Sequence, residues 1–275
     1  MAINNHSGKR AVVGAVRAAS SFFELAFEAV WPDRCLVCEA SLIGKRGPVF
    51  RWEPPIDALL CDQCKNQLVS PANAFCKRCA VALPSNAGVS RCGKCADADW
   101  YYSEVRPLHE YSGLARSVVL ALKRTSNRAL VETIARLYFS ARERELRAFA
   151  PDCVVAVPMY WQRKYFLRHG VNAPDKLAKR LAKSLRVPCM SRYLRRTRAT
   201  ASQTSLGWSE RATNVRGAFA AKPRVFVGKR VLLVDDAFTT GATANEISRI
   251  LLDAGAIVVC VAVLTRASVA LAPRS

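Results

Sequence analysis

Three apolar runs alternate with segments of helical periodicity in the second half of the chain. The runs cover residues 153–158 (CVVAVP), 231–235 (VLLVD) and 257–264 (IVVCVAVL), and their β-branched character predicts buried strands. Between them, apolar side chains recur at helical spacing over residues 174–186 and 242–254. Strands that are apolar along their whole length and separated by helices predict an α/β fold with a mostly parallel sheet and flanking helices.

Two further segments carry a helical pattern before this sheet. Residues 114–149 have apolar side chains at helical spacing, which predicts helix over the whole segment. Residues 11–31 are moderately apolar but are interrupted by three charged side chains, so they fit an amphipathic helix better than a signal peptide. We therefore expect an N-terminal extension over residues 1–30, no integral membrane association and a cytoplasmic location.

Eight of the eleven cysteines form four identical C-x-x-C pairs between residues 35 and 95. Two thiolates separated by two residues in a tight turn can bind one ion, and two such turns complete a tetrahedral shell. In a cytoplasmic chain, thiol pairs of this kind favour metal ligation over disulfides. The predicted metal ligands are Cys35, Cys38, Cys61, Cys64, Cys76, Cys79, Cys92 and Cys95.

Eight thiolates predict two structural zinc sites with four thiolates each. Sequential pairing of neighbouring motifs is the simpler arrangement, with crossed pairing as the alternative. Iron–sulfur ligation and thiol redox chemistry are the alternatives to zinc. Of the remaining cysteines, Cys153 and Cys260 lie in or beside apolar runs and are predicted to be buried core thiols, and Cys189 is given no role.

Positive charge is concentrated in one block of the chain. The formal net charge is +21, yet residues 1–100 carry 12 Lys and Arg against 9 Asp and Glu. Residues 160–230 carry 18 Lys and Arg against only Asp175 and Glu210. Such a block favours polyanionic partners, either nucleic acid or polyphosphate ligands. The alternative is a solvated surface that keeps the protein soluble.

Residues 231–243 (VLLVDDAFTTGAT) carry the most informative motif, in which a buried strand leads through two carboxylates and a hydroxylated turn into a helix. Open α/β folds bind ligands at the carboxyl ends of parallel strands. Backbone N–H groups at the helix start, with the Thr hydroxyls, would hold a phosphate, and Gly241 would let the backbone approach it. Asp235 and Asp236 would repel a phosphate, so they suit ribose hydroxyls or a magnesium ion. A plain strand–turn–helix with Thr capping is the alternative.

This stretch matches neither the Walker A nor the dinucleotide-binding pattern. It closely resembles the phosphoribosyl pyrophosphate (PRPP) loop of type I phosphoribosyltransferases. The resemblance implies that Asp235 and Asp236 engage the ribose and act as the catalytic residues, while the Thr-Gly turn holds the 5′-phosphate. The predicted PRPP-binding residues are Asp235, Asp236, Thr239, Thr240, Gly241, Ala242 and Thr243.

Residues 31–265 as a whole resemble the ComF family, in which a cysteine-rich double zinc ribbon precedes a type I phosphoribosyltransferase-like domain. One landmark runs from Tyr111-Ser112-Gly113 to Leu122-Lys123. Another is the strand exit at Val157-Pro158, although the later Arg-Gly-Phe-Asn-Gln turn of the family reads His169-Gly170-Val171-Asn172-Ala173 here. A third comprises Arg196, Thr197, Gln203, Thr204, Arg211, Asn214, Val215, Gly217, Ala218 and Phe219.

The resemblance implies a double zinc ribbon over residues 31–100 and a phosphoribosyltransferase-like domain over residues 101–275. It also implies PRPP with Mg²⁺ as ligand and an association with natural transformation, so that single-stranded DNA or the DNA-uptake machinery is the expected partner. Tyr193 and Trp208 lie within the basic block and would suit stacking on bases. The candidates for the pyrophosphate turn and lid are Arg163, Lys164, Arg168 and Arg211.

Two functional classes follow from this resemblance. The first is a phosphoribosyltransferase whose acceptor the sequence does not identify. The second is a non-catalytic, DNA-handling or adaptor protein in which the PRPP site is regulatory or vestigial. Thr239 bears on this choice, because some purine-type transferases have an acidic residue, a candidate general base, at the corresponding position.

The purified chain should contain about two zinc ions per molecule, because eight thiolates make two closed four-thiolate sites. Elemental analysis of protein prepared with reductant measures this, and iron or an absence of metal would contradict it. Cys61→Ser should unfold the cysteine-rich segment more than the C-terminal domain, because metal binding is coupled to local folding.

Overall fold

The structure, a computed structural model, describes residues 34–42, 56, 59–71, 75–84, 91–95, 100–124, 128–159, 172–200 and 213–267. The predicted amphipathic helix at residues 11–31 lies outside them. The elements are, in chain order, α2 (Asp62–Leu68), the 3₁₀ helix η3 (Gly93–Cys95), β1 (Glu104–Glu110), α3 (Gly113–Arg124), α4 (Arg128–Phe149), β2 (Cys153–Ala156), α6 (Ala173–Leu185), the 3₁₀ helix η4 (Ser191–Tyr193), β3 (Leu194–Arg196), β4 (Phe219–Ala221), β5 (Arg230–Phe238), α8 (Ala242–Asp253) and β6 (Val258–Arg266).

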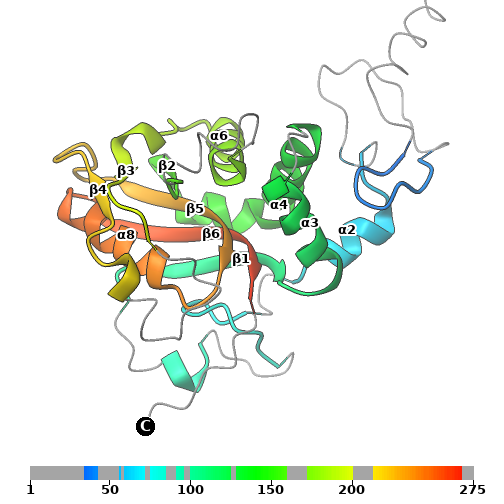
Figure 1. The fold of residues 1–275 in the computed structure, drawn as a ribbon, viewed down its shortest axis with the longest axis horizontal. Helices are drawn as coiled ribbons and strands as arrows, with labels where there is room; N and C mark the ends of the chain where they lie inside the picture. The colour runs from blue at the N-terminus through cyan, green and yellow to red at the C-terminus, as the bar shows by residue number, and fades with distance from the viewer. Residues whose placement is uncertain are drawn as a thin grey trace, which may run out of the picture. The chain divides into compact units, whose positions relative to one another are not determined.

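Four parallel strands form the main sheet, in the order β1-β6-β5-β2 (Figure 1). β5 lies inside the sheet, where Val234 is opposite Ala262 of β6 and Ala156 of β2. A parallel bridge between Val154 and Cys189 extends the sheet beyond β2. The carboxyl ends of β2, β5 and β6 therefore meet at one edge of the sheet.

Helices cover both faces of this sheet, which explains why its inner strands are apolar along their length. Successive side chains of a strand point to opposite faces. Val231 and Leu233 of β5 share a buried core with Ile247 and Leu251 of α8. α6 packs against α4, β2 and β5, and Figure 1 shows α3, α4 and α6 on the side of the sheet away from α8.

Most of the predicted elements are confirmed. The three apolar runs form β2, β5 and β6, and the two helical patterns between them form α6 and α8. Cys153 and Cys260 are fully buried in this core, as predicted. β5 is longer than its apolar run and continues to Phe238, so Asp235 and Asp236 belong to the strand and do not follow it.

The helix predicted over residues 114–149 corresponds to two helices, α3 and α4, in the described residues. α3 ends at Arg124 and α4 begins at Arg128. Residues 125–127, between the two helices, lie outside the described residues.

Two strand pairings were missing from the sequence-based prediction. β1 has the sequence EVRPLHE, with a proline and four charged or imidazole side chains, and it pairs with β6 alone among the described strands. Proline cannot donate a backbone hydrogen bond, so it is tolerated at such an edge. β3 and β4 form a separate antiparallel pair in which Arg196 lies opposite Phe219.

The chain divides into two compact units, Met1–Cys64 and Lys65–Ser275. The first unit contains the first two C-x-x-C pairs, and the second unit contains the other two pairs together with the sheet. The boundaries that the resemblance implied, at residues 30/31 and 100/101, stay predictions. Among the described helices, none has the length and apolar character needed to cross a bilayer.

Candidate functional site

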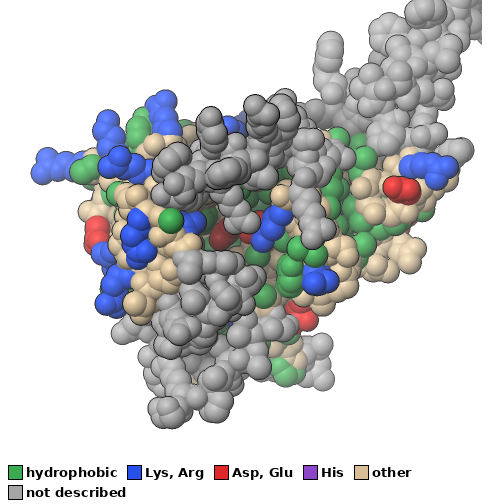
Figure 2. Space-filling model, in the orientation of Figure 1, with side chains coloured by type: hydrophobic (Ala, Val, Ile, Leu, Met, Phe, Trp, Pro, Cys, Tyr) green, Lys and Arg blue, Asp and Glu red, His purple; other side chains and the backbone are tan. Residues whose placement is uncertain are grey.

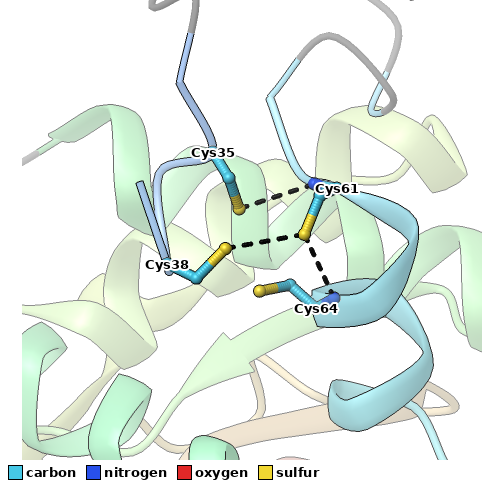
Figure 3. A group of neighbouring side chains, drawn as sticks. All are labelled: Cys35, Cys38, Cys61 and Cys64. Atoms are coloured by element: carbon cyan, nitrogen blue, oxygen red, sulfur yellow. Dashed lines mark hydrogen bonds between the residues drawn. The ribbon is translucent and has the colours of Figure 1, made fainter. Parts of the chain in front are cut away.

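The first four cysteines converge on one point. Cys35 and Cys38 lie on a tight turn, Cys61 and Cys64 lie at the start of α2, and their sulfur atoms face one another (Figure 3). All four sulfurs lie within 4.8 Å of one another, and those of Cys38 and Cys61 are 3.6 Å apart. Four thiolates at a Zn–S distance of about 2.3 Å form a tetrahedron with edges of about 3.8 Å, so the spacing fits zinc.

The other four cysteines form a second cluster of the same kind. Cys76 and Cys79 lie on a turn, Cys92 and Cys95 lie at η3, and all four sulfurs are within 4.8 Å of one another. The sulfurs of Cys79 and Cys92 are 3.6 Å apart. Sequential pairing of the C-x-x-C motifs is thereby confirmed. Each cluster joins a tight turn to a short helical turn, so the two sites share one design.

Backbone amides point at sulfur atoms in both clusters. The amide of Cys61 donates to Cys35 Sγ over 3.5 Å, and the amide of Cys92 donates to Cys76 Sγ over 3.3 Å. A hydrogen bond with the Cys79 thiol, together with amide hydrogen bonds, lowers the pKa of Cys76 to about 4 against the opposing effect of burial. Such donors stabilise thiolates and orient metal ligands. The donor set therefore fits a closed, four-thiolate structural site in each cluster.

The two carboxylates of β5 lie side by side near the carboxyl edge of the sheet. Asp235 is opposite Val263 of β6, and both carboxylates are half-buried. The amide of Asp236 donates to Asp235 Oδ1 over 2.8 Å. On the other side of β5, the amide of Val157 donates to the Val234 carbonyl over 2.9 Å, which places the strand exit at Val157-Pro158 beside the acidic pair.

Placing two carboxylates together in a partly dry site is electrostatically unfavourable. Burial, and then the negative charge of Asp236, raise the pKa of Asp235 well above its ordinary value. Lys123 opposes this effect, since its Nζ lies 3.5 Å from Asp236 Oδ2. A cation that bound between the two carboxylates would relieve the same repulsion.

The turn after β5 brings the start of α8 to the same edge. Gly241 is the N-cap of α8 at φ 82°, and the helix begins at Ala242, whose amide lies 3.4 Å from Thr240 Oγ1. Thr240 is buried, whereas Thr239 and Thr243 are half-exposed. The loop of residues 239–243 therefore presents the positive end of a helix and hydroxyl groups next to the acidic pair.

Gly241 is required for a local reason in addition to the predicted one. A Cβ on this residue would lie 2.7 Å from Phe238 Cζ and 3.0 Å from the Tyr102 hydroxyl, and the positive φ disfavours any side chain. Close approach of the backbone to a phosphate, as predicted from the sequence, is compatible with this geometry. The packing against Phe238 and Tyr102 was not foreseen.

The structure also adds a residue that sequence reasoning did not assign to the site. Lys123 lies in the last turn of α3, far from β5 in the sequence, and reaches the acidic pair. The sequence contained a signal for Lys123, because Leu122-Lys123 is part of one landmark of the ComF resemblance. The residues around Lys123 gave no indication that its partner is Asp236. The four candidates for pyrophosphate and lid contacts, Arg163, Lys164, Arg168 and Arg211, lie outside the described residues.

A basic surface surrounds the β3–β4 pair. Figure 2 shows Lys and Arg side chains gathered over the part of the face where β3, β4 and α8 lie. Arg196 does not share this exposure, because its guanidinium lies over the Phe219 ring at 5.5 Å and is half-buried. Tyr193 is also half-buried, with Arg192 and Lys222 against its ring. In the part of the chain that the structure describes, the exposed basic residues of this surface are Arg192, Arg195, Arg198, Arg216, Lys222 and Arg224.

Comparison with curated proteins decides the family. Over 224 residues the chain is 30% identical to competence protein F of Haemophilus influenzae, covering 79% of this chain and 90% of that protein. The chain belongs to the ComF family. It is also 30% identical over 210 residues to DNA utilization protein YhgH of Escherichia coli K12, covering 75% of this chain and 90% of that protein. No protein-family model matches the chain.

Solved structures give weaker similarities to this ComF-family chain. The glutamine PRPP amidotransferase of B. subtilis, complexed with ADP and GMP, is 24% identical, with 46% of this chain and 26% of that chain covered and a TM-score of 0.29. The UMP synthase of Leishmania donovani is 23% identical, with 53% and 24% covered and a TM-score of 0.32. At these TM-scores the similarity does not bear on function. The observed sheet confirms the predicted fold class as a mostly parallel α/β sheet with flanking helices, preceded in the chain by two four-cysteine clusters that fit the double zinc ribbon.

Asp235→Asn should increase the free energy of unfolding at neutral pH in the absence of ligand. The folded protein raises the pKa of Asp235, whereas the unfolded chain ionises it near pH 3.9. Wild-type stability therefore falls as the pH rises from that value toward the folded pKa, and the Asn variant does not suffer this loss. Urea unfolding at pH 5 and pH 8 measures the effect, and the advantage of Asn should be larger at pH 8. An advantage that is absent, or larger at pH 5, would show that Asp235 is not destabilised by its surroundings.

Proposed function

We propose that this chain binds PRPP together with Mg²⁺ at the carboxyl edge of its sheet, in the cytoplasm, and that it acts in the uptake or use of DNA. The observation that carries the proposal is the direct passage of β5 from Asp235 and Asp236 into the N-terminus of α8. The names of the relatives, competence protein F and DNA utilization protein, support the second part.

The polarity of the site matches the two ends of a ribose 5-phosphate. A phosphate would accept hydrogen bonds from the first amides of α8 and gain from the helix dipole. The carboxylates of Asp235 and Asp236 would accept hydrogen bonds from the vicinal hydroxyls of the ribose. We call the loop of residues 239–243 the phosphate loop. Because Asp235 and Asp236 precede it by only a few residues, both interactions involve one sugar phosphate.

Magnesium fits the acidic pair because its positive charge would offset the repulsion between the two carboxylates, which makes the pair unfavourable without a cation. Mg²⁺ prefers oxygen ligands and keeps several waters, so it usually binds one or two carboxylates together with the phosphates of a ligand. The charge of the ion would favour the ionised form of Asp235, whose pKa the protein otherwise raises. Lys123 would then be free to contact the pyrophosphate of the ligand, since it lies at the same edge.

Binding is the part of a transferase reaction that these residues support most directly. Phosphoribosyl transfer breaks the bond between the anomeric carbon and the pyrophosphate, and the protein stabilises the leaving group mainly by position and charge. The described part of the chain supplies Lys123 for that purpose, and Arg163, Lys164, Arg168 and Arg211 are the further candidates. Thr239 cannot act as a general base. A role for PRPP as a regulatory ligand needs only the binding groups, so it makes fewer demands on the site than catalysis does.

The exposed basic surface around β3 and β4 favours a second function, the binding of single-stranded DNA. Among the described residues, six exposed Lys and Arg side chains there could contact phosphates. Arg196 and Arg198 also make contacts within the fold. Arg196 lies over the Phe219 ring, and Arg198 donates to the carbonyls of Asn214 and Arg216 over 3.0 and 2.7 Å. The residues best suited to a test are therefore Arg192, Arg195 and Lys222, all of which are exposed.

PRPP with Mg²⁺ should bind the wild-type chain, and Asp235→Asn combined with Asp236→Asn should weaken this binding by roughly 100-fold or more, since two hydrogen bonds to charged groups are lost. Thr240→Val should weaken it by about fivefold, because one hydroxyl is removed. Calorimetry measures both effects. Asp253→Asn is the matched control, because this exposed carboxylate at the other end of α8 pairs with Arg249.

Equal affinity of the wild type and the double variant would overturn the PRPP proposal, as would a failure of the wild type to bind. Binding without turnover of any nucleobase would identify PRPP as a regulatory ligand. The substitution of His169–Ala173 for the family's turn, and Thr239 at the position of a candidate base, would then be the first explanations to examine.

Binding of single-stranded DNA should weaken steeply with salt, because several phosphates release counterions on binding. Replacing Arg192, Arg195 and Lys222 by Glu should flatten the slope of log K against log salt by about one unit for each lost phosphate contact. Fluorescence anisotropy with a labelled oligonucleotide measures the slope. An unchanged slope in this variant would favour the solvated-surface interpretation.

A further inference from the structure

The turn of the second cysteine cluster, residues 76–80, is hydrogen-bonded to the sheet at three consecutive carbonyl groups. We call this turn the second knuckle. The carbonyl of Lys77 accepts from the Val105 amide over 2.7 Å, that of Arg78 from the Tyr102 hydroxyl over 2.9 Å, and that of Cys79 from Arg266 Nε over 2.6 Å. A four-thiolate metal site would fix these carbonyls, because two of its ligands belong to the turn.

The second knuckle is also buried in the core of the sheet domain. Ala80, which follows Cys79 at φ 53°, is fully buried and belongs to the same apolar cluster as Tyr102 and Phe238. The guanidinium of Arg78 donates to the Tyr102 carbonyl over 2.5 Å, so Tyr102 is held at both its backbone and its hydroxyl. The contact is therefore specific, and it joins this metal site to the domain that carries the phosphate loop.

Tyr102 continues from the second knuckle to the phosphate loop. Its ring is fully buried and lies edge-on to the ring of Phe238, with 6.1 Å between centroids. Its hydroxyl lies 3.0 Å from the point where a Cβ of Gly241 would be. The side chain thus fills the space between the knuckle and the residue that caps α8, and its length sets how close they can come.

Arg266 makes a second connection between the same two parts. It is buried at the end of β6 and donates from Nε to the Cys79 carbonyl. Its NH1 group lies 3.5 Å from the Phe238 carbonyl, and its guanidinium lies 5.6 Å from the centre of the Phe238 ring. Phe238 is the last residue of β5, immediately before the loop of residues 239–243.

We propose that the second cysteine site positions the phosphate loop, and that Tyr102 and Arg266 are the positioning residues through which it does so. Metal at this site fixes the knuckle carbonyls, the carbonyls fix Tyr102 and Arg266, and these two side chains fix Phe238 and Gly241. The loop is then held ready to receive a phosphate, and loss of the metal loosens it. The effect on PRPP rests on the function proposed above, whereas the effect on the loop itself does not.

Tyr102→Phe tests the connection with the smallest change, because it removes only the hydroxyl that bonds to Arg78. Tyr138→Phe is the matched control, since the Tyr138 hydroxyl also donates from a fully buried ring to a backbone carbonyl, that of Arg106, over 2.7 Å. Hydrogen exchange of peptides covering residues 238–245 should be faster in Tyr102→Phe than in wild type, and unchanged in Tyr138→Phe. PRPP affinity should fall roughly three- to tenfold in Tyr102→Phe alone.

The metal itself is tested by comparing Cys95→Ser with Cys64→Ser, which each remove one thiolate from one cluster. Exchange of residues 238–245 should increase more in Cys95→Ser than in Cys64→Ser. Unchanged loop exchange in Tyr102→Phe, or equal effects of the two cysteine variants, would overturn the proposal. If Cys95→Ser unfolds the whole domain, peptides from β5 and β6 will also exchange rapidly, and the Tyr102→Phe comparison then decides.

The exchange measurement needs no ligand, so it separates this proposal from the proposed function. Faster loop exchange in Tyr102→Phe, with no binding of PRPP by wild type, would support the positioning role and contradict the PRPP site. Normal PRPP binding by wild type and Tyr102→Phe, with unchanged exchange, would support the PRPP site and contradict the positioning role.

Discussion

The parallel pairing of β5 with β6 is the constraint on which the acidic pair, the phosphate loop and the second knuckle all depend. Its register sets Asp235 opposite Val263 and Phe238 opposite Arg266. A shift of one residue would turn every side chain of a strand to the other face of the sheet, where it would have to fit a different, closely packed set of neighbours. One ladder of backbone hydrogen bonds therefore fixes both the carboxylates of β5 and the Arg266 guanidinium that contacts the second knuckle.

The site concentrates features that a purely structural segment would avoid. Two carboxylates adjoin in a half-buried position, and the residue that caps α8 has a left-handed backbone conformation. The surrounding structure holds them in place through Lys123 on one side and through Tyr102 and Phe238 on the other. Local conflict that is maintained by well-packed neighbours is common at ligand-binding sites. In this account the sugar, the phosphate and the magnesium ion of PRPP resolve the conflict.

The sequence was most informative where the signal is local. The C-x-x-C spacing predicted two four-cysteine clusters with sequential pairing, and residues 231–243 predicted a strand, an acidic pair, a turn and a helix in the right order. Contacts between distant residues could not be predicted in this way. Arg266 meets the carbonyl of Cys79 across 187 positions of the chain, and neither residue carries a local pattern that names the other.

Elements whose stability comes from their neighbours were also missed. β1 lacks an alternating or continuous apolar pattern and contains Pro107, so only its pairing with β6 makes it a strand. β3 and β4 have three residues each, too few to show a period.

In the proposed site, the acidic pair holds one sugar phosphate at its hydroxyls and the phosphate loop holds it at its phosphate. Comparing the affinities of ribose 5-phosphate and 2-deoxyribose 5-phosphate by calorimetry tests it most directly, because the two ligands differ by a single hydroxyl. We expect that ribose 5-phosphate binds and that the deoxy sugar binds about tenfold more weakly, since a carboxylate loses its donor. Equal affinity for the two sugars, or no binding of either, would contradict it.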